Sequence, residues 1–416
     1  MIHNQGPARG ARASEAASTR SPPFVSPLEG PMLIASLYAY AFLGEFILIY
    51  PVYALLFTDT GLSVAQASSL FVIWSVTGTL LEIPSGAWAD TVSRRLLLCL
   101  GPLLAALGFA LWVLFPSYWV FAAGFVLWGA QGALVSGAYE ALAYEELERR
   151  GQAGRYATVM GRASALGLVA NAAAIGLAVP VFATGGYPAV ATASVLACVL
   201  CAATALTLPE HRTRAASDDR RYLSVLKEGI TQARADRGVT HAVLLVAFVT
   251  AIWGALEEYV PFLGAEMGVA QTFIPLLILL VWVGATGGGL LAGAAERLPA
   301  RPYALMLGLA ALVMAAGAIS GHPAGFVLIA LAFGAFQLAG VLAGVRLQER
   351  ITGPARATVT SVAGLGTNVV TLGVYAAYGA ASPYASHGVT FALLTLPYVL
   401  IALLTARTRP LQRSTG

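Results

Sequence analysis

The stretch "GTLLEIPSGAWADTVSRR", residues Gly78–Arg95, joins an apolar run to charges that such a run does not normally contain. Glu82 stands among leucine, isoleucine and proline, Asp90 follows further on, and Arg94 and Arg95 end the stretch. A charged side chain is costly to bury in apolar surroundings, so a carboxylate there needs a specific reason. The stretch predicts an apolar helix that contains an acidic residue and is followed by a charged loop.

The composition of the chain excludes an ordinary soluble domain. Of its 416 residues, 58% are hydrophobic and 11% are charged, whereas soluble domains have about 25% charged residues. The excess apolar side chains must face lipid, so we expect an all-α protein of the plasma (inner) membrane. The three cysteines lie in apolar runs without a His or Cys cluster, and we expect no metal site.

The apolar runs predict twelve membrane spans, because a helix needs about 20 apolar residues to cross the hydrocarbon core. They form two sets of six, separated by a polar stretch. The expected spans are 31–57, 67–89, 96–115, 119–142, 157–183 and 187–208, followed by 241–264, 272–295, 302–320, 324–346, 357–380 and 387–406.

The runs also predict the organisation of the chain. We expect a disordered cytoplasmic tail (1–30), an N-terminal half (31–208), a cytoplasmic central linker (209–240), a C-terminal half (241–406) and a cytoplasmic tail (407–416).

Charge is distributed unevenly between the two sides of this arrangement. If the spans alternate, all 24 Lys and Arg residues fall on one side. The opposite loops hold only Asp59, Glu266, His322 and His387 as charged or histidine residues. The positive-inside rule then predicts that both termini are cytoplasmic. The excess of Lys and Arg over Asp and Glu follows from this asymmetry and does not indicate nucleic-acid binding.

The two halves echo each other in sequence. "LGEFILIYPVY" (Leu43–Tyr53) opens the first half and "WGALEEYVPFL" (Trp253–Leu263) opens the second, with Pro51 aligned to Pro261. Two more pairs, "RYATVMG" with "RATVTS" and "GAWADTVSR" with "GAAERLPAR", occur in the same order. All lie about 200 residues apart, the length of one six-helix half, which indicates an internal repeat.

"GAWADTVSRR" resembles the loop signature of the major facilitator superfamily, through Gly86, Asp90, Arg94 and Arg95. The twelve spans, the repeat and the charged linker extend the resemblance over nearly the whole chain. It implies a transporter in which two six-helix halves rock around a midplane cavity. "LEIPSG" and "SGAYEALAYEELERR" further resemble a bacterial exporter-like subgroup.

The resemblance implies a cytoplasmic gate at this loop. Gly86 would let two helices approach closely. Asp90 would face the N-terminus of the eleventh span, near Ala357, where negative charge is favourable.

The two arginines of the loop would complete the gate. Arg94 and Arg95 could pair with Glu140 or Glu145 at the end of the fourth span and close the cytoplasmic side. The alternative is that they serve only as topology anchors.

The chain also departs from the pattern of drug/proton antiporters. Trp128 stands where many of them have an arginine, three residues before the pair Gln131-Gly132. The fifth span has no Gly-Pro pair. Both departures weigh against a standard drug/proton antiport mechanism.

Acids within the spans are the candidates for coupling: Glu45, Glu82, Glu140, Glu257 and Glu258. A charge at mid-bilayer costs about 2.5–3.5 kcal/mol on insertion scales, and no lysine or histidine lies at that depth. We therefore expect some of these acids to hold a proton. Each acid also has a purely structural alternative. Glu45 could serve only to hydrogen-bond a tyrosine, and Glu82 could satisfy backbone groups at a kink before Pro84. Glu140 could be the structural partner of an arginine. At most one of Glu257 and Glu258 should face a cavity.

Aromatic and amide side chains accompany these acids. Tyr50, Trp253, Asn171 and Asn368 are assigned to the same substrate and coupling site, although each could instead pack or bond across helices. Aromatic rings with carboxylates suit lipophilic cations.

The sequence therefore predicts a secondary active transporter that works by alternating access. The favoured function is proton-coupled efflux of a lipophilic neutral or cationic small molecule, by a monomer with no cofactor. No G-x-x-x-x-G-K-[ST] loop occurs, so ATP is not expected to drive it directly. The rivals are an importer or facilitator on the same fold, and a membrane receptor or enzyme.

Overall fold

The computed structural model describes residues 29–211, 236–296, 298–351 and 356–407. Within these ranges, the side chains of residues 29–30, 83–84, 86–91 and 356–358 are not described. Most of the predicted tails and of the predicted linker lie outside the described residues, as do the surroundings of Gly86 and the side chain of Asp90. All regular elements of the described part are helices, which confirms the all-α prediction.

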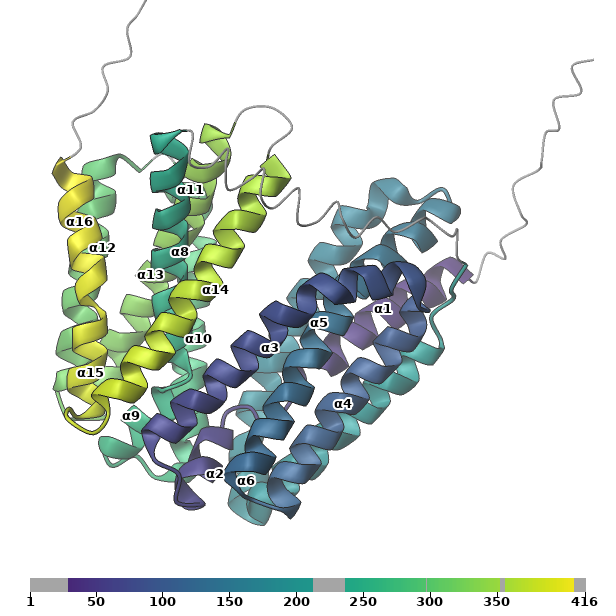
Figure 1. Cartoon of the computed structure of the whole chain (residues 1–416), viewed down its shortest axis with the longest axis horizontal. Coiled ribbons are helices and arrows are strands. Elements are labelled where there is room, and N and C mark those ends of the chain that lie inside the picture. The colour runs from purple at the N-terminus through teal and green to yellow at the C-terminus, as the bar shows by residue number, and fades with distance from the viewer. Residues whose placement is uncertain (1–28, 212–235, 297, 352–355, 408–416) are drawn as a thin grey trace, which may run out of the picture.

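Helices of the N-terminal half form one bundle, on the right in Figure 1. They are α1 (Glu29–Glu45), α2 (Tyr53–Asp59), α3 (Val64–Thr91), α4 (Arg94–Leu114), α5 (Tyr118–Arg149), the short η1 (Ala153–Arg155) and α6 (Tyr156–Leu206).

Helices of the C-terminal half form the second bundle. They are α8 (Arg237–Glu257), α9 (Val260–Glu266), η2 (Gln271–Phe273), α10 (Ile274–Leu290), α11 (Ala292–Ala295), α12 (Ala300–Ile319), α13 (Gly325–Arg350), α14 (Arg356–Ala381), α15 (His387–Leu394) and α16 (Leu396–Arg407).

Ten helical segments of the described part are long and apolar enough to cross a membrane. One of them contains α6, which consists of two helical parts joined at Gly186, where φ is +59° and the backbone is not helical. It therefore covers two of the predicted spans. The 17-residue α1 continues as α2 beyond a break and accounts for another span.

The first span of each half is discontinuous. Residues 46–52 separate α1 from α2, and Glu258 and Tyr259 separate α8 from α9. Proline accompanies each break, because it has no N–H to continue a helix: Pro51 precedes α2 and Pro261 lies in the first turn of α9. The sequence echo thus marks a pair of helix breaks, at which Glu45 ends α1 and Glu257 ends α8.

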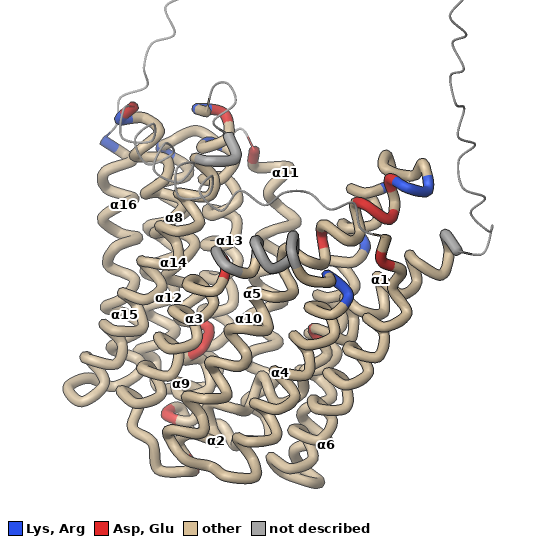
Figure 2. The backbone as a smooth tube through the Cα atoms, turned by 45° about the vertical axis from the view of Figure 1, so that its right-hand side comes forward, with Lys and Arg blue, Asp and Glu red and all other residues tan. Residues whose placement is uncertain are grey.

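The two bundles meet at one end and lie apart at the other. Figure 1 shows them converging at the end that carries α2 and α9. Contacts between them run from α3 to α14, from α6 to α10 and from α2 to α9. The described Lys and Arg residues gather toward the opposite end (Figure 2).

Packing inside each bundle relies on small residues and aromatic rings. A Cβ added to Gly108 of α4 would lie 3.1 Å from the carbonyl oxygen of Gly124 on α5, so the two backbones are nearly in contact. Large apolar side chains also point outward, such as Leu305, Leu312 and Leu331, each more than 60% exposed. A hydrocarbon solvent explains this exposure.

Candidate functional site

Two cavities lie between the halves, and side chains from both halves line each of them. The larger has a volume of about 490 Å³. Its lining includes Tyr40, Glu45, Phe109, Trp128, Gln131, Tyr139, Glu140, Asn171, Cys198 and, from the other half, Trp282. A space of this size suits a drug-sized ligand.

The second cavity has a volume of about 470 Å³ and lies between α3, α5, α8 and α14. Its lining includes Trp74, Thr79, Glu82, Trp128, Gln131, Glu258, Asn368 and Tyr375. Trp128 and Gln131 line both cavities, so the two spaces adjoin. Trp128 stacks on Trp74 with 5.3 Å between ring centroids, at the position where drug/proton antiporters often have an arginine.

Glu45 lies at the wall of the larger cavity, at the last residue of α1. Its side chain packs against Gly167, and its carboxylate makes no hydrogen bond or ion pair within the described residues. The tyrosine bond considered for it is therefore absent there. Glu140 and Asn171 line the same cavity.

Glu82 lines the second cavity, together with Asn368. The helix α3 continues through Pro84, and the carbonyl oxygen of Glu82 accepts a bond from Ser85 Oγ. Asn368 donates from Nδ2 to Thr79 Oγ1 at 3.2 Å, a bond between the halves.

Glu257 and Glu258 join the two halves directly. Tyr50 donates its hydroxyl to Glu257 Oε1 at 2.8 Å, and Trp282 donates its indole N–H to the same oxygen at 2.7 Å. Tyr53 donates to Glu258 Oε2. The two tyrosines belong to the N-terminal half and both acids to the C-terminal half, so the acids lie in a polar contact at the interface of the halves.

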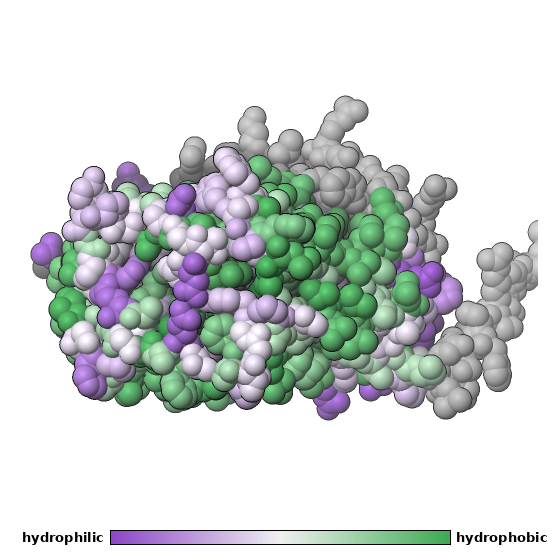
Figure 3. Space-filling model, turned by 90° about the horizontal axis from the view of Figure 1, so that it is seen from below, coloured by the Kyte–Doolittle hydropathy of each residue, from purple (hydrophilic) through white to green (hydrophobic). Residues whose placement is uncertain are grey.

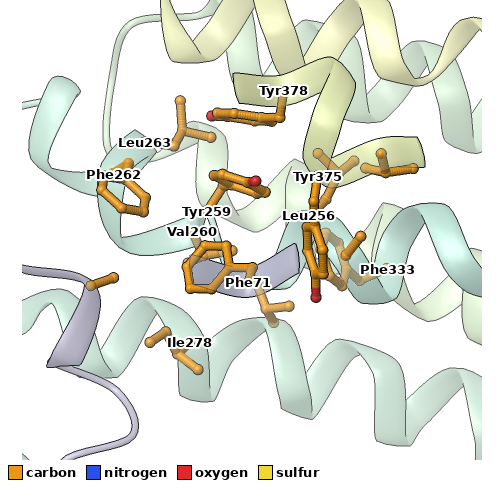
Figure 4. Close-up of a cluster of buried hydrophobic side chains, with 14 of the residues drawn as sticks. Phe71, Leu256, Tyr259, Val260, Phe262, Leu263, Ile278, Phe333, Tyr375 and Tyr378 are labelled. Atoms are coloured by element: carbon orange, nitrogen blue, oxygen red, sulfur yellow. The ribbon is translucent and has the colours of Figure 1, made fainter. Parts of the chain in front are cut away.

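An aromatic layer beside this contact seals the same interface. Figure 4 shows Tyr259 between Tyr378 and Phe71. Tyr259 stacks on Tyr378 with 3.5 Å between centroids and meets Phe71 of the other half edge-on at 5.5 Å. Its hydroxyl donates to Ser68 Oγ, also of the other half, at 2.8 Å. Phe71 and Ser68 of the N-terminal half thus both contact Tyr259 of the C-terminal half.

A third contact lies at the surface of that end. Asp59, at the end of α2, accepts a hydrogen bond from Tyr187 Oη at 2.6 Å. It also accepts one from Gln271 Nε2, across the halves, at 3.0 Å. The surface there mixes hydrophilic and apolar side chains (Figure 3). Three successive contacts therefore hold the halves together at this end.

At the opposite end, the loop arginines behave differently from each other. Arg94 pairs with Glu145 at 2.5 Å, one of the two partners considered for it, whereas Arg95 is exposed. Both Arg94 and Glu145 belong to the N-terminal half, so this ion pair does not join the halves. Glu140 lies at the cavity instead of in this pair.

A second charged cluster at this end was not found from the sequence. Glu146 is 2% exposed and accepts bonds from Arg150 Nη1 at 2.6 Å and from the backbone N–H of His211 at 3.0 Å. Glu210 accepts from Ser93 Oγ and from the backbone N–H of Arg94, at the N-terminus of α4. Acids at the end of a predicted span were the available signal, but apart from Arg150, four residues from Glu146, the partners are distant in the chain.

The structure places Trp253 apart from the predicted site. Its ring meets Phe333 at 5.7 Å, and Trp253 is not part of the lining of either large cavity. Its position on α8 turns it toward α13. Tyr53, which was not among the predicted site residues, takes part in the polar contact in its place.

Two six-helix bundles with broken first spans and cavities between them define a secondary transporter that works by alternating access. The chain belongs to the Major Facilitator Superfamily, whose family model matches residues 34–372. Proteins of this superfamily typically perform no enzymatic reaction. A search of the curated proteins found no match.

Solved structures share the fold at low sequence identity. The nucleoside transporter NupG is 13% identical, with a TM-score of 0.70 over 90% of this chain and 98% of its own. A bacterial homologue of the human lysosomal transporter Spinster is 16% identical, with a TM-score of 0.68 over 92% and 96%. A D-xylose–proton symporter is 16% identical, with a TM-score of 0.63 over 91% and 97%. Identities this low support the fold alone.

Proposed function

We propose that this protein is a proton-coupled exporter of lipophilic cationic or neutral small molecules. The observation that carries the proposal is the lining of the two central cavities. Both combine acids with aromatic rings, and no Lys or Arg side chain of the described residues lines either of them. A cation with apolar substituents fits such a surface, because carboxylates and ring faces both attract positive charge.

The side of the membrane follows from the arginines. The positive-inside rule puts the arginine-rich end in the cytoplasm. The three contacts at the opposite end then close the outer side, and the conformation faces inward. A similar structure, that of the Spinster homologue, is itself described as inward-facing.

A proton gradient supplies the driving force in this proposal. Acids without a basic partner at mid-membrane are neutralised most simply by a proton. A proton taken up outside and released inside provides the energy for export. The alternative of uptake has a specific parallel, since one similar structure is a D-xylose–proton symporter. A polar sugar fits this aromatic lining less well than a lipophilic cation does.

Ethidium, a permanent lipophilic cation, tests the proposal. Purified protein in liposomes with an imposed pH gradient should move ethidium uphill against its concentration, in exchange for protons. An ionophore that removes the gradient should stop the uphill movement. The direction of uphill movement relative to the proton flux separates export from uptake, and a panel of cationic, neutral and sugar substrates in the same liposomes identifies the substrate class. Movement of the sugar alone would contradict the proposal.

A further inference from the structure

We infer that Glu258 is the residue that carries the coupled proton, and that its bond with Tyr53 makes proton uptake close the outer gate. The outer gate is defined here by Tyr50, Tyr53, Glu257, Glu258 and Trp282. The inference rests on the proposed function and assigns the proton to one of its candidate acids.

The hydrogen bonds distinguish the two adjacent acids. Glu257 accepts from two donors, Tyr50 and Trp282, through one oxygen. Glu258 accepts from a single donor, Tyr53. Donors stabilise the ionised form, and two neighbouring carboxylates in a dry site do not both ionise readily. Glu257, which accepts hydrogen bonds from two donors, therefore keeps the negative charge, and Glu258 holds the proton.

Among the described residues, no basic side chain faces the pair to relieve this crowding. The titratable groups that face the pair are Tyr50 and Tyr53 from the first span, Tyr259 beside it, and Tyr375 from α14. Lys, Arg and His are absent from these facing groups in the described part of the chain. A second negative charge would therefore be uncompensated while the gate is closed, and closure favours the protonated form of Glu258.

Access to Glu258 is one-sided in this conformation. Its side chain is 9% exposed and lines the 470 Å³ cavity, from which a proton can leave. On the gate side, Tyr50, Tyr53, Ile278 and both acids enclose a void of only about 10 Å³. Such a void is about the least that one water needs, so the space between Glu258 and the outer end holds at most about one water there.

The cycle balances one proton for each turnover. With the outer gate open, the Glu258 carboxylate takes a proton from outside and becomes a neutral acid. Neutral Glu258 can enter the interface between the halves and accept a hydrogen bond from Tyr53, and this contact stabilises the closed gate. It then releases the proton to the inner cavity, where a cationic substrate compensates the charge that remains.

Gate opening can be read from Ile278, which is 3% exposed and lines the closed void. Figure 4 labels Ile278 near the aromatic layer. We would introduce Ile278→Cys into a variant with its three cysteines replaced by alanine, after checking that this background still transports. A membrane-impermeant maleimide applied outside reports the open gate. Because the thiolate is the reactive form, all labelling rates are expressed relative to that of Ser117→Cys, at an exposed position of the predicted outer side, in the same background and at the same pH. Raising the external pH from about 6 to about 8 should raise this relative rate several-fold, because ionised Glu258 disfavours closure.

Variants assign the effect to Glu258. Glu258→Gln should label slowly at both pH values, since it mimics the protonated acid, whereas Glu258→Asp should keep the pH dependence. Glu257→Gln should keep it too. Tyr53→Phe should label about tenfold faster, because a buried acid loses its donor. Glu148→Gln, an exposed acid on α5, controls for loss of one charge.

Two outcomes overturn the inference while leaving the proposed function intact. One is pH-dependent labelling that persists in Glu258→Gln. The other is loss of that dependence in Glu257→Gln alone. If the parent protein moves ethidium with no response to a pH gradient, the proposed proton-coupled function is contradicted, whatever the labelling shows.

Discussion

Tyr50 of the N-terminal half donates its hydroxyl to Glu257 of the C-terminal half at 2.8 Å, although 207 positions separate them in the chain. Tyr50 lies in the break between α1 and α2, and Glu257 is the last residue before the break between α8 and α9. The two discontinuous spans therefore meet through polar side chains at the interface of the halves. A residue at the helix break of one half thus contacts a residue at the corresponding helix break of the other half.

The first prediction concerns this contact. Tyr50→Phe should leave Trp282 as the only donor to Glu257, and a hydrogen bond to a charged group is worth about 1.5–3 kcal/mol. The population with separated outer ends should therefore rise. Electron–electron distance measurements between spin labels at Ser63 and Ala270 would show it as a longer distance component. Tyr384→Phe, at a tyrosine that is 90% exposed, should leave the distances unchanged. Equal distances in Tyr50→Phe and the parent would contradict the role of this bond.

The second prediction concerns orientation. A cysteine at Ser117, between α4 and α5, should react with an impermeant thiol reagent outside the cell. A cysteine at Ser217, in the predicted cytoplasmic linker, should not react until the membrane is opened. Labelling at Ser217 in sealed cells would reverse the proposed orientation.

The third prediction concerns Arg94 and Glu145. Their ion pair is partly exposed, so its loss should cost only about 0.5–1 kcal/mol. Arg94→Gln should lower the thermal stability of the detergent-solubilised protein slightly, and Arg95→Gln, at an exposed position, should not. The exchange Arg94→Glu with Glu145→Arg should restore part of the loss. Identical melting curves for both single variants would show that the pair contributes nothing.

The fourth prediction concerns Asp90, whose side chain lies outside the described part. Asp90→Asn should keep the fold but weaken closure of the cytoplasmic side, since it removes the negative charge proposed to face a helix N-terminus. Transport should fall more than the amount of protein in the membrane. Normal transport by Asp90→Asn would make it an ordinary loop residue.

The fold could be predicted from local patterns. Apolar runs of about 20 residues mark the spans because the bilayer sets their length. The aligned Pro51 and Pro261 indicated the repeat, but the spans 31–57 and 241–264 were predicted as continuous helices, and the break within each of them was missed. The separate predicted spans 157–183 and 187–208 agree with the turn at Gly186 inside α6, although the sequence could not show the positive φ that forms it.

The candidate site was predicted only in part. Glu45, Glu140 and Asn171 share one cavity and Glu82, Glu258 and Asn368 the other. Which acid meets which donor depends on how the halves pack. Tyr53 and Glu258 are 205 positions apart, so no spacing rule joins them. The Trp253 ring meets Phe333 and does not line either large cavity, because helical position alone does not say which neighbour a ring faces.

The central claim is that acids between the halves couple proton movement to substrate movement. Its most direct test measures ethidium and luminal pH together in liposomes with an imposed pH gradient. The parent and single Glu→Gln variants at positions 45, 82, 257 and 258 are compared, because glutamine keeps the shape but cannot titrate. The account predicts uphill ethidium movement with matched proton flux in the parent. At least one variant, Glu258→Gln first, should lose the uphill movement and keep downhill exchange. Uphill pumping by all four variants at the rate of the parent would contradict the account.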